Sequence, residues 1–444
     1  MANPFSIFEA AADCPDRAGL RRAGQDYSFA RLARLTENTI ERLHKENVLP
    51  EKGRPMIIEG TNTVETIVLL YALFELGVPA LMLHPKLTAA ERHVLLESIR
   101  HIKDPLPDDT AAVLFTSGTT GLPKPAIITR KMLIESARAS EQNLGWQDND
   151  CWQLCMSVTR IGGLSILTRC LFARKTLAIS PLFSPESFTQ ALLDDKVTIT
   201  SIVPTMLAKV FETYPQWKAP ETLRVILLGG SSANDKLLNK AHEHGLPIVT
   251  TYGMTETCSH VVMTPYADRL KLVKGSGKVI SGAQVRVRDG QIEVNSPMNT
   301  PGYWGRDPIT TPWFETGDLG EFDEDGILHV FARRHDLILS AGENVYPLEV
   351  ENMLTRSPFI KEALVIGEPN ETWGAIVCAL IVPEKGTHPK PEDVRRFCKE
   401  TLSAYKCPRK IAIVDALPIN AADKPDRRPQ VLERYNLTPL HYKH

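Results

Sequence analysis

A short run of hydroxyl and glycine residues at positions 116–124, Thr-Ser-Gly-Thr-Thr-Gly-Leu-Pro-Lys, carries the plainest chemical signal in the chain. Phosphate oxygens need short hydrogen-bond donors and a backbone that can approach them closely. Glycine permits such an approach because it tolerates positive φ angles, and Lys124 adds a cation. The spacing is not that of a Walker A loop, but it predicts a phosphate-binding loop. Its expected phosphate-contacting residues are Thr116, Ser117, Gly118, Thr119, Thr120, Gly121 and Lys124.

The elements that must position this loop alternate between short apolar strands and helical patterns. Residues 111–115 (AAVLF) predict a buried strand directly before the loop, which an ordinary polar turn would not require. A helix is predicted at 132–145. Strands at 224–228 and 247–251 enclose a predicted helix at 232–244. Such alternation is typical of βαβ units in a mostly parallel sheet.

Downstream of residue 283 the pattern changes to antiparallel strands. Residues 284–294 alternate with period two around Asp289-Gly290, a dipeptide that favours a type I′ hairpin turn. A further strand is predicted at 327–331. Beyond 333–336 lies an α+β segment of about 110 residues, an ordinary domain size. Its predicted elements are helices at 348–356 and 391–402 and strands at 362–366, 375–382 and 410–414.

Composition and charge limit the classes of protein. The 444 residues suggest two or three domains, and 43% hydrophobic with 23% charged residues is typical of a soluble globular protein. A net charge of −2 creates no field that would draw the chain to nucleic acid or to a membrane, so neither is predicted as a partner. Charged and turn residues interrupt the apolar stretch 64–83, which therefore predicts a buried helix leading into a strand.

The N-terminus and the cysteines indicate the compartment. The first residues lack a basic start followed by an apolar run, so no secretory signal is predicted. The eight cysteines form no CxxC pair and no zinc-finger spacing, so we expect reduced and mostly buried thiols. Both observations predict a cytoplasmic protein.

Five further segments follow the loop in a fixed order. They are Thr-Tyr-Gly-Met-Thr-Glu at 251–256, Thr-Gly-Asp at 316–318, Arg333, Ser-Ala-Gly-Glu-Asn-Val-Tyr-Pro at 340–347, and Lys424. Each is a weak signal alone, but in this order they resemble the motifs of the adenylate-forming superfamily over nearly the whole chain. That superfamily includes acyl- and aryl-CoA ligases, luciferases and peptide-synthetase adenylation domains.

The resemblance implies a fold and a reaction. The implied fold is a large N-terminal α/β body of parallel-type sheets with a small β-barrel-like part, and a small mobile C-terminal α+β domain. The expected boundaries are a large domain for ATP and acid binding over 1–332, a hinge over 333–336, and a small domain with the catalytic lysine over 337–444. The implied reaction uses ATP and Mg²⁺ to convert a small carboxylic acid into an acyl-AMP, whose acyl group passes to coenzyme A.

The family motifs imply roles for particular residues. Lys424 would bridge the carboxylate and the α-phosphate, Thr255 would hydrogen-bond that phosphate, and Glu256 would bind Mg²⁺. Asp318 would accept two ribose hydroxyls, with support from Arg333. The remaining positions are Tyr252, Gly230 and Ser231 beside the nucleotide, Gly229 beside the acid, Gly253 beside both, and Ser340, Gly342 and Glu343 beside coenzyme A.

The short chain most resembles the o-succinylbenzoate-CoA ligases of menaquinone biosynthesis. The supporting segments are 83–88, 161–167, 203–205 and 227–230. Arg169 falls where that subfamily has an arginine for a substrate carboxylate, which a guanidinium binds through two parallel hydrogen bonds. Arg160 stands where many relatives have histidine, and it would offer a cation to a second anionic group on a different acid.

Three alternatives stay open. Another aryl or small acyl acid could be the substrate, and a carrier-protein thiol could replace coenzyme A as the acceptor. The third is a non-catalytic nucleotide or acyl sensor, which departures from the usual family residues at Arg160, His335 and Asp423 suggest. The retained magnesium carboxylate, ribose carboxylate and late lysine argue against a sensor. The sequence also leaves a homodimer open.

Overall fold

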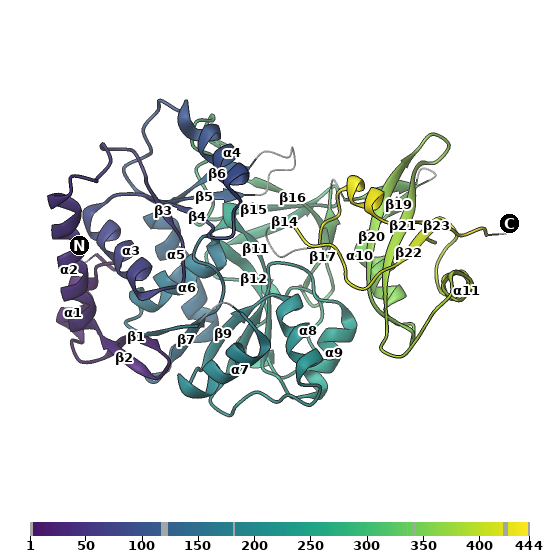
Figure 1. Cartoon of the computed structure of the whole chain (residues 1–444), viewed down its shortest axis with the longest axis horizontal. Coiled ribbons are helices and arrows are strands. Elements are labelled where there is room, and N and C mark those ends of the chain that lie inside the picture. Colours follow the sequence, from purple (N-terminus) through teal and green to yellow (C-terminus); the bar gives the residue numbers. More distant parts are fainter. Residues whose placement is uncertain are drawn as a thin grey trace.

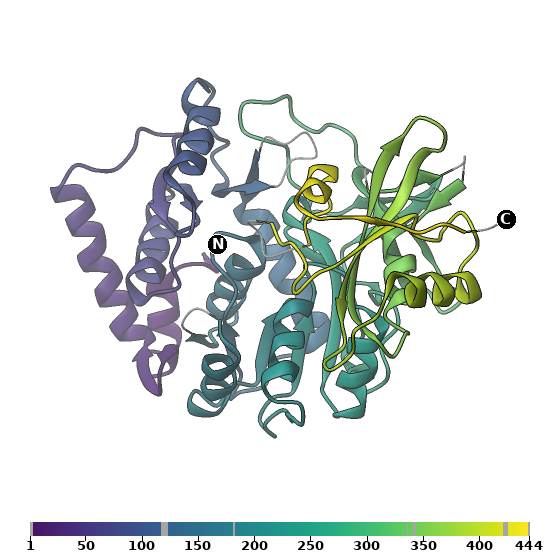
Figure 2. The same ribbon diagram turned by 45° about the vertical axis from the view of Figure 1, so that its right-hand side comes forward.

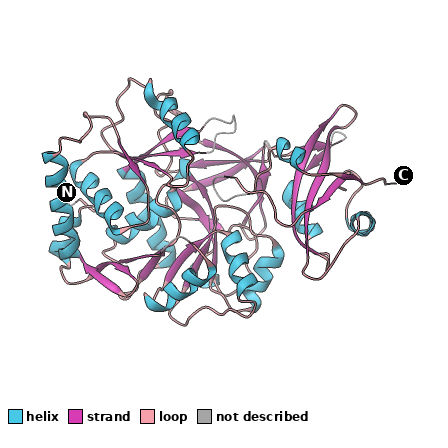
Figure 3. Ribbon diagram, viewed as in Figure 1, coloured by secondary structure: helices cyan, strands magenta, loops and turns pink. Residues whose placement is uncertain are grey.

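The computed structural model describes residues 3–116, 123–180, 183–334, 336–340, 343–420 and 425–442. A large body is followed by a smaller domain at the C-terminal end of the chain (Figure 1). Helices surround the strands of the body (Figure 3). Within the described residues, no helix combines the length and hydropathy needed to cross a membrane.

The largest sheet has nine strands in the order β13-β12-β11-β10-β9-β7-β8-β1-β2. Their bounds are β1 Ala18–Arg22, β2 Gln25–Ser28, β7 Cys151–Leu154, β8 Thr176–Ile179, β9 Ile199–Ile202, β10 Val225–Leu228, β11 Ile248–Met254, β12 Ser259–Met263 and β13 Lys278–Val279. The strands from β11 to β1 pair in parallel, and antiparallel strands lie at both ends. Strands β7, β9 and β10 are buried throughout, as expected for parallel strands covered on both faces.

A second sheet carries the strand that precedes the predicted phosphate loop. Its order is β3-β4-β5-β6, with bounds β3 Met56–Glu59, β4 Ala80–Leu83, β5 Thr110–Thr116 and β6 Lys124–Thr129. The first three strands are parallel, and β6 returns antiparallel to β5. Strand β5 is buried up to Phe115, as the apolar run predicted.

A third sheet is antiparallel and has the order β14-β15-β16-β17. Its bounds are β14 Gln284–Arg288, β15 Gln291–Asn295, β16 Phe314–Phe322 and β17 Leu328–Arg333. The predicted hairpin is confirmed, and its turn residues Asp289 and Gly290 have φ angles of 51° and 75°, both positive as a type I′ turn requires. This part, for which the sequence predicted a barrel-like shape, is an open sheet in the described residues.

The small domain has a six-stranded sheet of its own in the order β19-β18-β21-β22-β23, with β20 beside β21. Its strands are β18 Ile338–Ser340, β19 Glu343–Val345, β20 Ile360–Asn370, β21 Gly374–Pro383, β22 Lys410–Ile413 and β23 Thr438–Pro439. Helices α10 (Pro347–Leu354) and α11 (Pro391–Thr401) pack on it through buried apolar residues. The predicted helices and strands of this segment are therefore present.

The helices of the body cover its sheets. They are α1 Ile7–Asp13, α2 Phe29–Lys45, α3 Val64–Leu76, α4 Ala89–Arg100, α5 Arg130–Leu144, α6 Ile161–Phe172, α7 Pro185–Asp194, α8 Pro204–Thr213 and α9 Asp235–Glu243, with short 3₁₀ turns η1 Thr255–Thr257, η2 Tyr266–Asp268 and, in the small domain, η3 Pro429–Arg434. Helix α9 begins three residues later than predicted because the Asn234 side chain caps it by accepting from the Leu237 amide.

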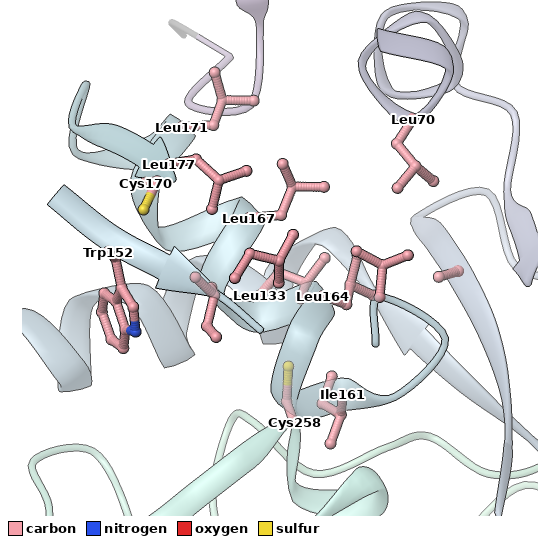
Figure 4. Close-up of a cluster of buried hydrophobic side chains, with 14 of the residues drawn as sticks. Leu70, Leu133, Trp152, Ile161, Leu164, Leu167, Cys170, Leu171, Leu177 and Cys258 are labelled. Atoms are coloured by element: carbon pink, nitrogen blue, oxygen red, sulfur yellow. The ribbon is translucent and has the colours of Figure 1, made fainter. Parts of the chain in front are cut away.

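Helix α6 lies in the main core of the body. Most of its residues are apolar and almost all are buried, including the polar Ser165, Thr168 and Arg169. Its Leu164 and Leu167 belong to one cluster with Leu133 of α5 and Trp152 of β7 (Figure 4). All eight cysteines are free thiols and seven are buried, which confirms the prediction for them.

Figures 1 and 2 show the small domain beside the body. Within the described residues, three ion pairs join it to helices α8 and α9. Lys236 Nζ lies 2.6 Å from Glu384 Oε2, and Lys361 Nζ lies 2.6 Å from Glu212 Oε1. The third pair joins Arg356 to Asp235 at 3.4 Å. The orientation of the small domain is therefore supported by polar contacts at its rim.

Candidate active site

Strands β5 and β6 hold the two ends of the predicted phosphate loop side by side. Thr116, the last residue of β5, pairs with Lys124, the first residue of β6. The intervening residues 117–122, which carry most of the predicted phosphate contacts, lie outside the described residues. The Lys124 ammonium lies 5.3 Å from the centre of the Tyr303 ring.

Asp318 is the centre of a polar cluster at the junction of two sheets. It is 6% exposed and accepts a hydrogen bond of 2.8 Å from the Tyr252 hydroxyl of β11. It also pairs with Arg333, its cross-strand partner on β17, with 3.2 Å between Nε and Oδ1. Burial and the Asp318 charge raise the pKa of Tyr252 well above its usual value, so its hydroxyl stays a donor. Three residues predicted around the nucleotide are thus in contact.

Glu256 lies in the turn η1, directly after Thr255 and the end of β11. It is 7% exposed, and its Oε1 accepts a hydrogen bond of 3.0 Å from the Tyr303 hydroxyl. Within the described residues, no group of three or more His, Cys, Asp or Glu side chains could hold a metal ion. A single carboxylate fits Mg²⁺, which usually keeps waters and substrate phosphates as its other ligands.

Two of the predicted glycines occupy places where a side chain would collide. A Cβ on Gly229 would lie 2.1 Å from Thr251 Oγ1, and one on Gly253 would lie 1.9 Å from the Ser259 carbonyl oxygen. Gly230 has a φ of +79°, which favours glycine. These residues, with Ser231, follow or form the carboxyl ends of β10 and β11, the edge where α/β sheets bind ligands.

The two arginines predicted for the acid lie at opposite ends of α6. Arg160 precedes the helix, and its Nη1 lies 3.4 Å from the carbonyl oxygen of Phe115, next to the phosphate loop. Arg169 is near the other end and is 2% exposed. Its Nη2 donates to Ser136 Oγ at 2.8 Å, while its Nε has no hydrogen-bond partner among the described residues. No carboxylate in the described part of the chain forms an ion pair with it.

A second buried polar atom accompanies Arg169. His260 Nε2, on β12, likewise lacks a hydrogen-bond partner in the described residues. Burial lowers the pKa of the Arg169 guanidinium to about 10, and burial together with the Arg169 charge lowers the pKa of His260 well below its usual value. A buried cation without a counter-ion costs free energy. Arg169 is therefore a poor stabiliser of the fold and a reasonable receptor for an anion.

Replacing Arg169 by methionine tests this interpretation. We expect the variant to melt at the same or a higher temperature, because methionine fills similar space without a buried, unpaired charge. We also expect KM to rise about tenfold for a dicarboxylic acid substrate and far less for its monocarboxylic analogue. Calorimetry and initial-rate assays would measure both. A large fall in melting temperature, with unchanged KM values, would instead assign Arg169 a purely structural role.

The residues predicted for coenzyme A and for acid activation belong to the small domain. Ser340 ends β18 and pairs with Glu343 of β19, whereas Gly342 lies outside the described residues. Lys424 also lies outside them. Beyond it, Arg427 pairs with Glu351 of α10, with 2.8 Å between Nη2 and Oε2. The chain that follows the lysine is thus anchored to α10.

The contacts of Tyr303 and Arg427 were not predicted from the sequence. Tyr303 lies in the run Pro-Gly-Tyr-Trp-Gly at 301–305, whose glycines indicate only a turn. Arg427 lies in a basic pair, which on its own indicates solvated surface. The position of Arg427 three residues after Lys424 in the sequence is the one feature that could have indicated a role in anchoring this segment.

Comparison with known proteins identifies the class to which this fold and site belong. Residues 97–304 match the family model described as AMP-binding enzyme, and residues 349–424 match the one described as AMP-binding enzyme C-terminal domain. A 2-succinylbenzoate–CoA ligase from Bacillus mycoides is 32% identical, and the match covers 96% of this chain and 97% of that protein. The chain belongs to the AMP-binding enzyme family.

One relative has been solved in two informative states. The o-succinylbenzoate CoA synthetase from Bacillus subtilis in complex with the acyl-adenylate intermediate OSB-AMP matches with a TM-score of 0.85 at 31% identity, over 96% of this chain and 97% of that one. The same synthetase with ATP and a magnesium ion matches with a TM-score of 0.84 at 31% identity, over 96% and 98%. The predicted family and the predicted body with a small C-terminal domain are confirmed.

Proposed function

We propose that this protein is an AMP-forming acid–thiol ligase that activates 2-succinylbenzoate and transfers it to coenzyme A. The observation that carries the proposal is the convergence of Lys124, Glu256 and Asp318 on one site. They come from strand β6, turn η1 and strand β16; Tyr303 contacts Lys124 and Glu256, and Tyr252 of β11 contacts Asp318. The similarity to 2-succinylbenzoate–CoA ligases along almost the whole chain supports the choice of acid and thiol.

The nucleotide is held chiefly through its ribose. A carboxylate accepts hydrogen bonds only, and it can accept from two neighbouring hydroxyls at once. Asp318 is already fixed by Tyr252 and Arg333, so little side-chain freedom is lost when a ribose binds. The adenine then lies near Tyr252 and the glycines after β10.

The first chemical step joins two anions. A carboxylate oxygen of the acid attacks the α-phosphorus of ATP, the bond to the bridging oxygen of the β-phosphate breaks, and pyrophosphate leaves with that electron pair. The protein must supply cations and donors where negative charge accumulates. Lys124, Thr255 and Lys424 do so. A Mg²⁺ ion held at Glu256 would neutralise part of the triphosphate charge.

The second step transfers the acyl group. The sulfur of coenzyme A attacks the acyl carbonyl, the bond to the phosphate oxygen of AMP breaks, and the thiol proton passes to solvent. Ser340, Gly342 and Glu343 face the thiol after the small domain turns about residues 333–336. Hinge motion of this kind is a common way of completing a catalytic site.

The acid carries a second carboxylate that does not react and must be bound. Arg169 is buried without an acidic partner in the described residues, and Arg160 reaches the end of β5 beside the phosphate loop. Two cations near α6 support a dicarboxylic substrate. A monocarboxylic acid would leave the buried Arg169 without an anion.

The decisive assay measures AMP release from ATP with Mg²⁺, coenzyme A and 2-succinylbenzoate. We expect AMP only when acid and thiol are both present, and ATP–pyrophosphate exchange with the acid alone. Turnover with a different aryl or acyl acid and none with 2-succinylbenzoate would reject the proposed substrate. Turnover only with a carrier-protein thiol would reject coenzyme A. Absence of exchange with every acid would favour a sensor.

Reversing one charge at the rim of the small domain should alter the balance between the two steps. The overall similarity to the OSB-AMP complex supports the proposal that the present orientation serves adenylation. Exposed ion pairs contribute about 0.2–1 kcal/mol each. Lys236→Glu is therefore expected to slow ATP–pyrophosphate exchange about threefold, with less effect on thiol transfer from preformed acyl-adenylate.

The matched control exchanges both charges. Lys236→Glu combined with Glu384→Lys re-forms the pair in the opposite sense, and we expect it to restore exchange to near the original rate. Both variants are compared at low and high salt, because screening weakens exposed pairs. If the double variant remains as slow as the single one, the pair does not control the orientation.

A further inference from the structure

Tyr303, which is not among the predicted site residues, contacts two residues that are: Glu256 and Lys124. Its hydroxyl donates to Glu256 Oε1 at 3.0 Å. The Lys124 ammonium lies 5.3 Å from the centre of its ring. One aromatic side chain therefore touches the carboxylate proposed to hold Mg²⁺ and the lysine that ends the phosphate loop.

The backbone around Tyr303 fixes its position. The Thr300 amide donates to the Glu256 carbonyl at 2.7 Å, and the Thr300 hydroxyl donates to the Ile127 carbonyl at 2.7 Å. The Trp304 amide donates to the Pro125 carbonyl at 2.9 Å. Residues 300–304 thus connect strand β6 to the turn η1. The ring has little freedom to leave the space between Lys124 and Glu256.

The hydrogen bond from Tyr303 also orients the carboxylate of Glu256. An ionised carboxylate only accepts, so the phenol must be the donor. The bond occupies Oε1 and turns the carboxylate so that Oε2 is left for another partner. Hydrogen bonds to charged groups are the stronger ones in proteins, and they restrict the geometry of the group. The ring face attracts the lysine by a cation–π interaction.

We propose that Tyr303 is a positioning residue that aligns Glu256 for a divalent cation and Lys124 for the phosphates of the same nucleotide. The proposal rests on the proposed function, since it takes Glu256 as the metal ligand. It assigns the hydroxyl and the ring separate tasks. The hydroxyl serves the metal, and the ring serves the lysine.

The test compares binding of Mn²⁺–ATP with binding of metal-free ATP, without acid, by equilibrium dialysis of the whole enzyme. Tyr303→Phe should weaken Mn²⁺–ATP binding about tenfold and leave metal-free ATP binding unchanged, because it removes only the hydroxyl. Tyr303→Leu should also weaken metal-free ATP binding several-fold, because Lys124 loses the ring. The control is Tyr266→Phe, a tyrosine that faces Arg269 and Arg224 and has no contact with Glu256 or Lys124 among the described interactions. It should bind both forms as the wild type does.

Glu256→Gln separates this proposal from the one on which it rests. If Glu256→Gln weakens Mn²⁺–ATP binding and Tyr303→Phe does not, the role given to the Tyr303 hydroxyl is wrong while the metal ligand stands. If Tyr303→Phe weakens both nucleotide forms equally, the tyrosine is merely structural and the proposal is overturned. If Glu256→Gln has no effect on either form, the metal ligand is wrong and the proposal falls with it.

Discussion

Replacing Asp318 by alanine is expected to lower kcat/KM for ATP in pyrophosphate exchange by about a hundredfold. Hydrogen bonds to a charged group contribute about 1.5–3 kcal/mol each, and about 1.4 kcal/mol corresponds to a factor of ten. Two ribose hydroxyl contacts at the lower end of this range correspond to about two orders of magnitude. The loss should be largest in KM, because the ribose is bound equally in the ground state and the transition state.

Two further variants separate the ribose contact from the cluster around it. Asp318→Asn keeps the shape of the side chain but has one oxygen acceptor in place of two. We expect this variant to retain part of the affinity for ATP. Tyr252→Phe removes only the hydrogen bond that orients Asp318, so a change of a few-fold is expected. Arg333, whose side chain is 35% exposed, stays hydrated in the alanine variant, but the buried Tyr252 hydroxyl loses its acceptor, so a modest fall in melting temperature is expected. An unchanged KM for ATP in Asp318→Ala would remove this residue from the nucleotide site.

Much of the fold could be predicted because many strands and turns are specified by residues that are neighbours in the sequence. The apolar run before the phosphate loop became β5, and Asp289-Gly290 formed the hairpin between β14 and β15, since both depend on neighbouring residues alone. The open shape of the third sheet could not be predicted, because closure depends on pairing between strands far apart in sequence. The start of α9 was misjudged because the Asn234 cap was overlooked.

The sequence predicted residues for the candidate site but not the contacts among them. The motifs assigned Asp318 and Arg333 to the same ribose and Tyr252 to the nucleotide, but they did not predict that the three side chains contact one another. In the structure they contact one another, because β11 and the β16–β17 pair meet at this point. Nothing in the sequence indicated the role of Tyr303 for the same reason, since its partners are Glu256, 47 residues away, and Lys124, at the start of β6. Such tertiary contacts carry no local pattern.

The depth at which Arg169 lies was a further surprise of this kind. The sequence predicted Arg169 as the receptor for a substrate carboxylate but did not show how deeply its side chain lies. The structure buries it in α6 beside Trp152, with no carboxylate partner among the described residues. An arginine buried in this way fits a receptor for an anion. Because most residues of α6 are apolar, the sequence alone could not show that the side of the helix with Arg169 is buried as well.

Replacing Lys424 by alanine is expected to give the largest loss of all, about a thousandfold in the rate of ATP–pyrophosphate exchange. The carboxylate of the acid must approach a phosphate that already carries negative charge, and a cation between them stabilises the charge that builds up as the bond forms. Removing one such preorganised group commonly costs a factor of about 10²–10³. The melting temperature should not change, because residues after the lysine are anchored independently by the pair between Arg427 and Glu351.

Measuring the two half-reactions separately tests the role of Lys424 most directly. If Lys424 acts only while the acyl-adenylate forms, then Lys424→Ala should still transfer the acyl group from preformed acyl-adenylate to coenzyme A at close to the normal rate. Lys399→Ala, which removes an exposed lysine from α11, is the matched control and should leave both rates unchanged. Equal losses in both half-reactions would mean that the substitution disturbs the whole small domain. Wild-type exchange in Lys424→Ala would mean that another cation brings the two anions together, and Arg160, beside the phosphate loop, would be the first residue to test.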